Sequence, residues 1–552
     1  MKLLITAVNS RFSHSNPAIR YLRNAAEPYI DEVEIMEYTV NQNCRDVVKD
    51  IVVRNPDAAA FSVYIWNAEF VIKLLKDLKK ITPRLIITCG GPEVTFPSEC
   101  GKLIQELSDF IILGQGESAF AMLAENQFES NEKIISSQNV PFSQIPFPYR
   151  DEDFKSLKNK FLYYESSRGC PFRCSYCLSS RDDYRVSYRK IEEVKSEIKK
   201  ISENYTGTVK FVDRTFNASK KHSRDIWNYL VTLNDSNVYH FEIHPELLDD
   251  EDFEVLSRFP ASKIRFELGI QSVHEKTLNL INRKSDMRKI ERNILRLKKE
   301  TEINLHADLI AGLPGENLKD ISAGINFIMN LKPHQFQLGF LKILPGTLIH
   351  EQTQSFGIIF SESPPYTVYE TDTINFSEMG ILENIEHIIG TFYNTGLYSN
   401  IFRLLESSGD DWDSIFMKMS DFFASRKYSE LSSGWAKNCM IMKDFVVAEY
   451  PHILKFFNDC ARFDFFTNFY STDYPDGLSD EFTSGVRVKM LQKIKNEYES
   501  NTGLSDFVKR NEFGKIMYFI KENHDFFYGI PDDVCLMKIR RASEIAQYSL
   551  LL

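Results

Sequence analysis

The sequence predicts an α/β protein: two successive runs of alternating strands and helices, followed by a mainly α-helical segment. Short apolar stretches alternate with amphipathic ones over residues 1–125, and again over residues 161–375. Such alternation indicates parallel sheets whose faces are covered by helices. Over residues 376–552, apolar residues recur at three- and four-residue spacing, which indicates helices.

The first run reads as five strands. The stretches KLLITAV, VEIMEYT, AAAFSVYIW, RLIITCGG and DFIILGQG are apolar runs bounded by polar residues. Amphipathic stretches such as NPAIRYLRNAA and NAEFVIKLLKDLKK separate them. Ligands of such sheets bind outside the carboxyl ends of the strands. Those ends carry NSRFSHSNP, YIWNAE, GGPEVT and GQGE, which form the first candidate ligand site.

The second run reads as a partial (β/α)6 barrel. Its strands are FLYYESS, TVKFVDRTFN, VYHFEIHPELL, KIRFELGIQS, INLHADLIAGLPGE and HQFQLGFLKILPGT. In such a barrel the site lies at the face formed by the carboxyl ends of the strands. Residues 126–160, between the two runs, are polar and punctuated by prolines, so we expect a linker there.

Composition limits the function classes. The 552-residue chain is 43% hydrophobic and 26% charged, which is typical of folded domains with large cores. A net charge of -11 argues against a generally basic surface that coats nucleic acid, but it is compatible with a local basic groove. No apolar run reaches the roughly 18 residues of a transmembrane helix. The first residues, MKLLITAV, lack the features of an export signal. We therefore expect a cytoplasmic protein without membrane or nucleic-acid partners.

Three cysteines, Cys170, Cys174 and Cys177, lie in the segment SSRGCPFRCSYCLSS. A structural zinc site uses four ligands, usually in two close pairs, and the other six cysteines are isolated. A disulfide framework would suit an exported protein. Three thiolates suit a four-iron, four-sulfur (4Fe-4S) cluster with one iron left open to a small molecule. Three unrelated thiols, or a zinc site completed by a distant histidine, are the alternatives.

The segment SRGCPFRCSYC resembles the cluster loop of the radical S-adenosylmethionine (SAM) superfamily. It has the C-x-x-x-C-x-x-C spacing and an aromatic residue, Tyr176, before the third cysteine. The resemblance implies that the open iron binds the amino and carboxylate groups of SAM. It also implies that an electron from the cluster cleaves SAM to a 5'-deoxyadenosyl radical.

Further motifs of this resemblance lie at the strand ends of residues 161–375. Glu267, in the E-x-G-I-Q-S pattern, corresponds to the acid that accepts hydrogen bonds from the ribose of SAM. Asp213 lies where the superfamily contacts the amino group, although the usual GGE is absent. Arg283 corresponds to a bidentate partner of the carboxylate. The implied SAM contacts are Tyr176, Asp213, Glu267, Gln271, Arg283, Ile310 and Gly312.

Residues 1–125 resemble the cobalamin-binding domain of B12-dependent radical SAM enzymes. The resemblance rests on the order of an S-x-Y-x-W-N-like strand, GGPEVT and GQGE, directly upstream of the cluster loop. It implies a Rossmann- or flavodoxin-like domain that binds cobalamin. A nucleotide binder, or a domain without a ligand, is the alternative. The implied cobalamin contacts are Ser10, His14, Tyr64, Trp66, Asn67, Gly90, Gly91, Glu93, Gly114, Gly116 and Glu117.

The lower face of cobalt is a separate question. Many cobalamin domains carry a D-x-H-x-x-G motif whose histidine ligates cobalt, and this motif is absent here. His14, the only histidine in residues 1–125, lies in the corresponding loop. We expect His14 to hydrogen-bond a corrin amide or the backbone and not to ligate cobalt, since most loop histidines bind no metal.

The two resemblances together imply a cobalamin-dependent radical SAM enzyme, most simply one that transfers a methyl group to an unactivated carbon. A radical cyclisation or rearrangement without methyl transfer is the alternative reaction. A cobalamin- or redox-sensing binding protein is the alternative of another class. The expected partners are a small-molecule or peptide substrate and an electron donor such as a flavodoxin or ferredoxin. Residues 376–552 resemble the accessory carboxyl-terminal domain of some B12-binding radical SAM proteins.

Overall fold

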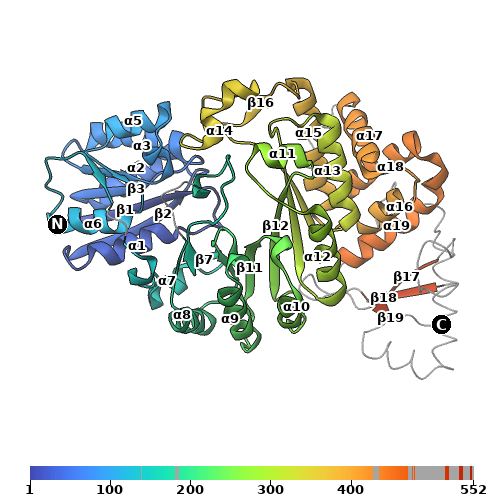
Figure 1. The fold of residues 1–552 in the computed structure, drawn as a ribbon, viewed down its shortest axis with the longest axis horizontal. Coiled ribbons are helices and arrows are strands. Elements are labelled where there is room, and N and C mark those ends of the chain that lie inside the picture. The colour runs from blue at the N-terminus through green and yellow to red at the C-terminus, as the bar shows by residue number, and fades with distance from the viewer. Residues whose placement is uncertain are drawn as a thin grey trace. The chain divides into compact units, whose positions relative to one another are not determined.

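The computed structural model describes residues 1–137, 140–180, 186–426 and 434–469, together with Pro475, Leu478 and three short strands near the carboxyl terminus. It divides into two units (Figure 1). The first comprises Met1–Gly324 and Leu338–Met379, and the second comprises Ile325–Gln337 and Gly380–Leu552. The two units are described separately below.

The first unit begins with a six-stranded sheet in the order β2-β1-β3-β4-β5-β6, in which all neighbouring strands are parallel. Its strands are β1 (Lys2–Asn9), β2 (Glu32–Thr39), β3 (Ala58–Ser62), β4 (Ile86–Gly90), β5 (Phe110–Leu113) and β6 (Ile134–Ser136). The five expected strands are present. The sixth, β6, comes from the stretch read as a linker, because three residues are too few to show an alternating pattern.

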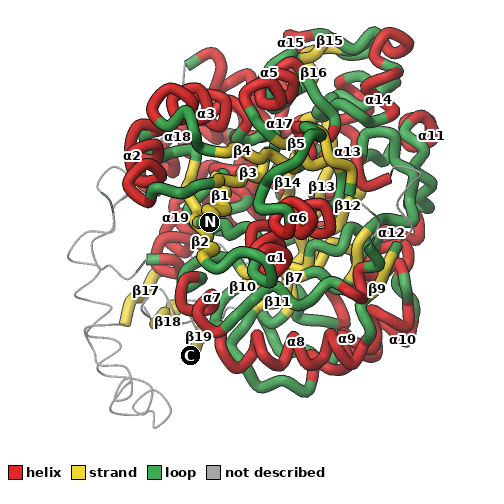
Figure 2. The backbone as a smooth tube through the Cα atoms, turned by 90° about the vertical axis from the view of Figure 1, so that its left-hand side faces the viewer, coloured by secondary structure: helices red, strands yellow, loops and turns green. Residues whose placement is uncertain are grey.

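Helices cover both faces of this sheet, as Figures 1 and 2 show. They are α1 (Pro17–Ala26), α2 (Cys44–Arg54), α3 (Ala68–Ile81), α4 (Pro92–Thr95), α5 (Glu99–Leu107) and α6 (Gly116–Glu125). Leu4 and Val8 of β1 belong to a core with α2, α3 and α5, whereas Leu3 and Ile5 belong to a core with α1 and α6. The strands are therefore apolar on both faces, which leaves their carboxyl ends as the place for polar ligand contacts.

The second sheet of the first unit has the order β14-β13-β12-β11-β10-β7. Its strands are β7 (Leu162–Tyr164), β10 (Thr208–Phe211), β11 (Val238–Ile243), β12 (Ile264–Gln271), β13 (Asn304–Ala311) and β14 (Gln335–Phe340). This open sheet confirms the expected six-stranded partial barrel. Its intervening helices are α8 (Ile191–Asn204), α9 (Lys220–Val231), α10 (Asp250–Leu256), α11 (Glu275–Leu280), α12 (Met287–Glu300) and α13 (Leu318–Leu331).

Strand alternation decides which side chains reach the inside of this barrel. In β12, Ile264, Phe266, Leu268 and Ile270 are buried. The intervening residues, Glu267 among them, face the other side. Glu267 lies in register with Glu242 of β11 and with His306 of β13. The inner face of the barrel therefore carries a row of ionisable side chains, because neighbours in register share a face.

The segment between the two sheets packs against α1. It includes α7 (Asp151–Ser156), whose Asp153 forms a buried ion pair with Arg23 of α1 at 2.7 Å. Tyr149, also in this segment, donates a hydrogen bond to the carbonyl oxygen of Tyr163 in β7 at 2.5 Å. After the second sheet the chain forms α14 (Leu348–Glu351), β15 (Ile359–Phe360) and β16 (Val368–Glu370). The cluster loop lies between the short strands β8 (Ser167–Arg168) and β9 (Ser187–Tyr188), which pair antiparallel.

The second unit is mainly helical. Its helices include α15 (Phe376–Ile388), α16 (Ser399–Glu406), α17 (Trp412–Ser425), α18 (Trp435–Glu449) and α19 (Leu454–Asn468). Aromatic contacts such as Phe402 with Trp412 fill its core. Three antiparallel strands also occur here, β17 (Ile516–Ile520), β18 (Val534–Lys538) and β19 (Tyr548–Ser549).

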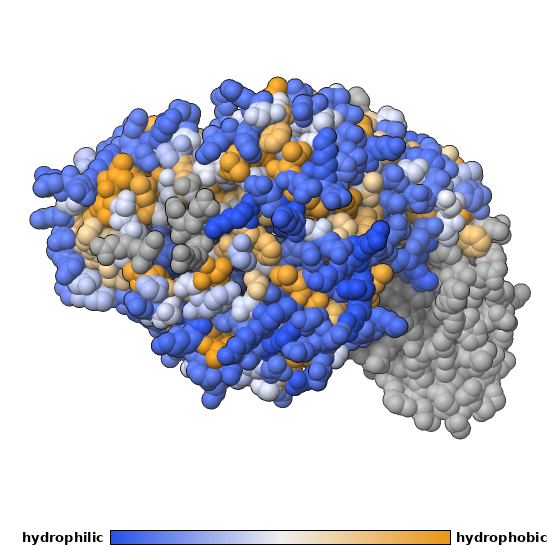
Figure 3. Space-filling model, viewed as in Figure 1, coloured by the Kyte–Doolittle hydropathy of each residue, from blue (hydrophilic) through white to orange (hydrophobic). Residues whose placement is uncertain are grey.

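Two surface properties bear on partners. The face drawn in Figure 3 is largely hydrophilic, with apolar residues gathered in separate patches. Within the described part of the chain, no helix combines the length and the apolar character needed to cross a bilayer.

Candidate functional site

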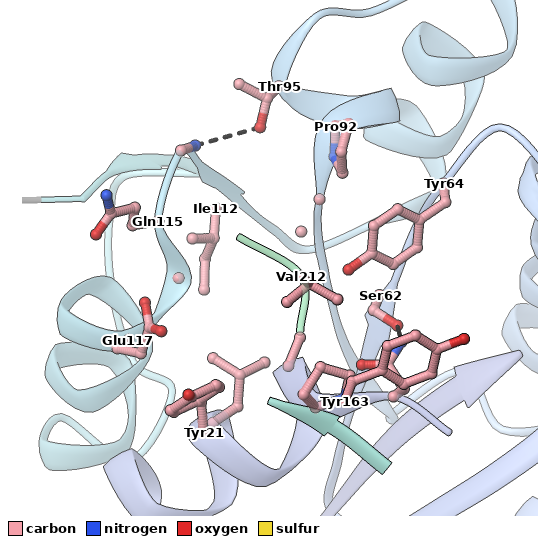
Figure 4. A pocket seen from close by; sticks show the side chains of 18 of the residues that line it. Tyr21, Ser62, Tyr64, Pro92, Thr95, Ile112, Gln115, Glu117, Tyr163 and Val212 are labelled. Atoms are coloured by element: carbon pink, nitrogen blue, oxygen red, sulfur yellow. Dashed lines mark hydrogen bonds between the residues drawn. The ribbon is translucent and has the colours of Figure 1, made fainter. Parts of the chain in front are cut away.

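A cavity of about 740 Å³ opens at the carboxyl ends of the strands of the first sheet. The loops after β1, β3, β4 and β5 line one part of it. The barrel supplies further lining residues, namely Tyr163, Glu165, Ser167, Arg168, Gly169, Val212 and Arg214. In Figure 4, Tyr64 and Tyr163 lie on one side of the cavity, and Gln115 and Glu117 lie on the other. A volume of this size is typical of a cofactor or ligand pocket.

The residues predicted to contact cobalamin line this cavity, with two exceptions. The lining includes Ser10, His14, Tyr64, Trp66, Gly90, Gly91, Gly114, Gly116 and Glu117. Asn67 is buried instead, and its side chain donates to the carbonyl oxygens of Val8 and Ser62 at 2.9 and 3.0 Å. Glu93 is also buried and accepts hydrogen bonds from Ser98 and Tyr366. Both side chains therefore hold loops in place.

The glycines that line the cavity differ in their backbone conformation and in the space around their Cβ positions. Gly91 has a φ of 115°, and a Cβ there would lie 2.4 Å from the carbonyl oxygen of Val63, so the backbone itself requires glycine. Gly114 has a φ of 79° and open space at its Cβ position. Its N–H donates to the hydroxyl of Thr95 at 3.2 Å (Figure 4). A Cβ at Gly90 would make only ordinary contacts, 3.6 Å from Ile112.

Two aromatic rings form part of the wall. Tyr64 and Trp66 stack with centroids 4.3 Å apart and an interplanar angle of 7°. The Trp66 indole N–H donates to the carbonyl oxygen of Val8 at 3.2 Å, yet 45% of the residue is exposed. The hydrogen bond of Trp66 holds the ring pair in place. The exposed apolar part of the two rings then offers a flat surface for a ligand.

The side chain of His14 contacts residues of the barrel. Its Nδ1 lies 2.6 Å from the hydroxyl oxygen of Tyr163, and its ring packs edge-on against Phe161. Burial, with the charges of Lys210 and Arg11, lowers the pKa of His14, which favours a neutral ring. This bond orients the ring through Nδ1, and the expectation that His14 bonds a corrin amide or the backbone rather than cobalt stays a prediction.

Arg168 connects the cavity to the cluster loop. Its Nη2 lies 2.7 Å from Glu117 at the start of α6 and 2.8 Å from Glu165. Its guanidinium also lies over the ring of Phe142, 4.5 Å from the centroid. Arg168 precedes Cys170 by two residues, so this ion pair ties the GQGE turn to the cluster loop.

None of the three predicted cluster ligands forms a disulfide with another described cysteine. Cys170 and Cys174 are buried, Cys177 is half-buried, and the N–H of Cys177 donates to the carbonyl oxygen of Cys174 at 3.1 Å. Burial raises the pKa of Cys170, and neighbouring Cys174 and Cys177 add to the effect. Among the described residues, no three His, Cys, Asp or Glu side chains converge around a single metal ion.

A second, smaller cavity of about 100 Å³ lies inside the barrel. Three of the predicted SAM contacts line it, Glu267, Gln271 and Arg283. Gln271 has a φ of 70° at a register shift between β12 and β13, which redirects the end of the strand. Arg283 donates to the carbonyl oxygen of Gly269, and its Nη1 lies 3.7 Å from the sulfur of Cys174. The small cavity therefore adjoins the cluster loop.

Glu267 is positioned as an ionised acid. The Nε2 of His240 lies 3.0 Å from its carboxylate. Burial acts to raise the pKa of Glu267, but the hydrogen bond and charge of His240, together with the charges of His306 and Lys210, lower it below its usual value. The carboxyl of Asp308, in the same cavity, has a pKa raised by burial and by the charges of Glu267 and Glu242. One ionised acid beside a protonated one suits the recognition of hydroxyl groups.

The other predicted SAM contacts lie outside the lining of the small cavity. Asp213 is buried and accepts from the hydroxyls of Ser166 and Ser167 at 2.6 and 2.5 Å. Burial raises the pKa of Asp213 to about 6. Gly312 has a φ of 85° and packs against Val368. Ile310 lies on β13, and burial raises the pKa of Tyr176 in the cluster loop.

Sequence reasoning missed several lining residues. His244, Glu242 and Asp308 line the small cavity, and strand alternation in β11 and β13 was the signal that could have found Glu242 and Asp308. Tyr163, Arg168 and Arg214 line the large cavity. No local pattern marks them, because they depend on how the two sheets of the first unit meet.

Family models match three successive parts of the chain. Residues 3–124 match the B12 binding domain, and residues 164–328 match the radical SAM superfamily. Residues 354–525 match a protein of unknown function (DUF4080). The first two matches coincide with the two parallel sheets.

Curated relatives are distant. The chain is 24% identical over 331 residues to the uncharacterized methyltransferase PH0819 of Pyrococcus horikoshii, covering 55% of this chain and 71% of that protein. It is 24% identical to a tRNA-2-methylthio-N(6)-dimethylallyladenosine synthase of Buchnera aphidicola subsp. Cinara cedri, covering 46% of this chain and 61% of the relative. It is 20% identical to the 2-(S-pantetheinyl)-carbapenam-3-carboxylate methyltransferase of Streptantibioticus cattleyicolor, covering 72% and 66%.

Solved structures share the fold. The cobalamin-dependent SAM radical enzyme OxsB, with aqua-cobalamin bound, superposes with a TM-score of 0.60 at 15% identity, covering 84% of this chain and 81% of that one. The radical SAM methyltransferase TsrM of Kitasatospora setae, with cobalamin and a [4Fe-4S] cluster bound, superposes with a TM-score of 0.52 at 14% identity, covering 64% and 78%. Residues 164–328 thus form a radical SAM domain, and residues 3–124 form a B12-binding domain that precedes it.

Proposed function

We propose that the protein transfers a methyl group from SAM to an unactivated carbon of a small-molecule or peptide substrate. The observation that carries this proposal is that Arg214 lines both the large and the small cavity. A reaction that uses cobalamin and SAM cleavage on one carbon needs the two sites side by side, since reacting groups must be held within contact distance. Two of the relatives are named as methyltransferases, which supports the same reaction.

The residues present fit the implied cofactors. When bound, cobalamin supplies a methyl acceptor and donor, and the cluster supplies the electron that cleaves SAM. Cys170, Cys174 and Cys177 lie in one loop and would hold the cluster through their thiolates. The glycine-rich turns at Gly90 and Gly114 allow a large ligand to approach the backbone closely, and the rings of Tyr64 and Trp66 offer it a flat wall.

The small cavity has the groups that SAM requires. Glu267 would accept hydrogen bonds from the ribose hydroxyls, and Arg283 would pair with the carboxylate, since both line this cavity. We assign Gln271 to the adenosine end and Ile310 and Gly312 to the adenine wall. Asp213 and Tyr176 act through the cluster loop, because Asp213 fixes Ser166 and Ser167 just before it.

We extend the proposal to organisation and partners. The domains run over residues 1–125, 126–160, 161–375 and 376–552, with the last as an accessory domain. A flavodoxin or ferredoxin supplies electrons, and the location is cytoplasmic, because a reducing compartment protects cluster thiolates.

The test is to supply the anaerobically reconstituted protein with cobalamin, a reductant and SAM that carries a CD3 group. Methyl transfer predicts S-adenosylhomocysteine and CD3-labelled cobalamin before any substrate is added. With a substrate, one 5'-deoxyadenosine and one S-adenosylhomocysteine should form per CD3-labelled product. Deoxyadenosine without coupled S-adenosylhomocysteine would favour a cyclisation or rearrangement, and the absence of SAM cleavage would favour a sensing protein.

A further inference from the structure

His244 is a buried histidine that the backbone holds rigidly. It follows directly after β11, and only 4% of it is exposed. Its N–H donates to the side-chain oxygen of Asn217 at 2.9 Å, and its carbonyl oxygen accepts from the Asn217 amide at 3.0 Å. The next carbonyl oxygen, that of Pro245, accepts from Asn293 at 2.9 Å. These buried bonds fix the backbone from which the imidazole projects.

The imidazole itself lacks the partners that buried polar groups normally have. Within the described part of the chain, neither Nδ1 nor Nε2 of His244 has a hydrogen-bond partner. Most buried polar side-chain atoms in proteins do have one, and an unsatisfied one destabilises the fold. A buried ring with two unsatisfied nitrogens, on a backbone fixed by hydrogen bonds, therefore points to a ligand that supplies the partner.

The position of His244 identifies which ligand. Its ring stacks on Phe172, which lies between Cys170 and Cys174, with centroids 5.3 Å apart. It also lines the small cavity together with Arg283, whose guanidinium reaches the sulfur of Cys174. His244 therefore occupies the end of the small cavity next to the cluster loop, where the proposed site would hold the methionyl part of SAM.

The methionyl amino group needs a hydrogen-bond acceptor, and the obvious acid is engaged elsewhere. Asp213 accepts from the backbone N–H of Ser166 and from the hydroxyls of Ser166 and Ser167. We propose that His244 binds the methionyl end of SAM by accepting a hydrogen bond from its amino group, while Arg283 pairs with its carboxylate. Burial and the charges of Arg283 and Lys289 lower the pKa of His244 to about 3, so its ring is neutral and can accept at pH 7. The inference rests on the proposed use of SAM and adds a residue to that site.

The experiment compares wild type with His244→Phe in the reconstituted, cluster-containing protein. SAM binding is measured by equilibrium dialysis and by the change that SAM produces in the EPR spectrum of the reduced cluster. The Kd for SAM should rise about tenfold, the effect of one such hydrogen bond. Without SAM, the variant should melt no lower than wild type, because two unsatisfied nitrogens are removed.

A ligand without the methionyl end is the control. 5'-Methylthioadenosine lacks the amino and carboxylate groups, so His244→Phe should leave its Kd unchanged. An unchanged Kd for SAM, or an equal loss of affinity for both ligands, would overturn the proposal. If the Phe variant does not fold, His244→Gln gives the same contrast with a smaller loss, since an amide still accepts. Both Kd values are independent of methyl transfer, so the proposed reaction can fail while this inference stands.

Discussion

Nδ1 of His14 lies 2.6 Å from the hydroxyl oxygen of Tyr163. This hydrogen bond joins the loop after β1, in the B12-binding domain, to the first strand of the barrel. The bond uses Nδ1 of the only histidine in residues 1–125 to join two parts of the site, and it sets the orientation of the ring.

The first prediction is that His14→Ala leaves cobalamin bound. The cavity keeps its glycine turns and the stacked Tyr64 and Trp66, so the affinity for cobalamin should fall by less than about tenfold, the effect of one lost hydrogen bond. The visible spectrum of the bound cobalamin should match that of wild type. Tyr163→Phe serves as the matched control, since it removes the same bond from the other side. A spectrum of histidine-ligated cobalt that His14→Ala abolishes would contradict this expectation.

The second prediction concerns the backbone of the cavity. Gly90→Val should block cobalamin binding, because the new side chain would stand beside Ile112 in the space that a close-approaching ligand needs. The apoprotein should fold normally, since a Cβ at Gly90 makes only ordinary contacts. Gly91 is unsuitable for this test, because any Cβ there meets the backbone of Val63.

Uptake of cobalamin by the purified variant, measured by absorbance after gel filtration, checks this prediction. Gly390→Val is the control, since its Cβ position is open and it lies outside the cavity lining. Normal cobalamin uptake by Gly90→Val would show that the ligand does not approach β4.

The third prediction separates the cluster from cobalamin. Replacing Cys170, Cys174 and Cys177 together by Ala should remove cluster iron and SAM cleavage. Cobalamin binding should persist, because none of the three cysteines lines the large cavity. Iron analysis, EPR and cobalamin absorbance of the same preparation give the three readouts. A full iron content in the triple variant would refute the assignment of the ligands.

Sequence patterns predicted most of the fold. Buried strands such as β1 and β3 are continuous apolar runs, and the cysteine spacing is specific on its own. Sequence patterns were less informative about where a polar side chain points. Asn67, Glu93 and Asp213 stand at strand ends among predicted ligand contacts, yet their side chains satisfy buried backbone and hydroxyl groups instead. A polar residue at a strand end can serve either purpose, and only the packing around it decides which.

Residues that line a cavity only because of tertiary contacts could not be predicted from the sequence, for a different reason. Tyr163 and Arg214 enter the large cavity only because the barrel meets the first sheet there, and no periodicity in either segment encodes that contact. His244 lies in the predicted strand and turn VYHFEIHPELL, but its missing partners become visible only when every neighbour is placed.

The last prediction concerns Arg168 and Glu117, which join the GQGE turn to the cluster loop at 2.7 Å. Arg168→Met should reduce the free energy of unfolding by about 2 to 4 kcal/mol, because it leaves two largely buried carboxylates, Glu117 and Glu165, without their partner. Glu117→Gln in the same background should recover part of the loss, since it removes one of the two uncompensated charges. Urea unfolding of wild type, both single variants and the double variant completes a thermodynamic cycle. A coupling energy near zero would mean that the ion pair does not hold the two loops together, and that Arg168 contributes only through its packing on Tyr21 and Phe142.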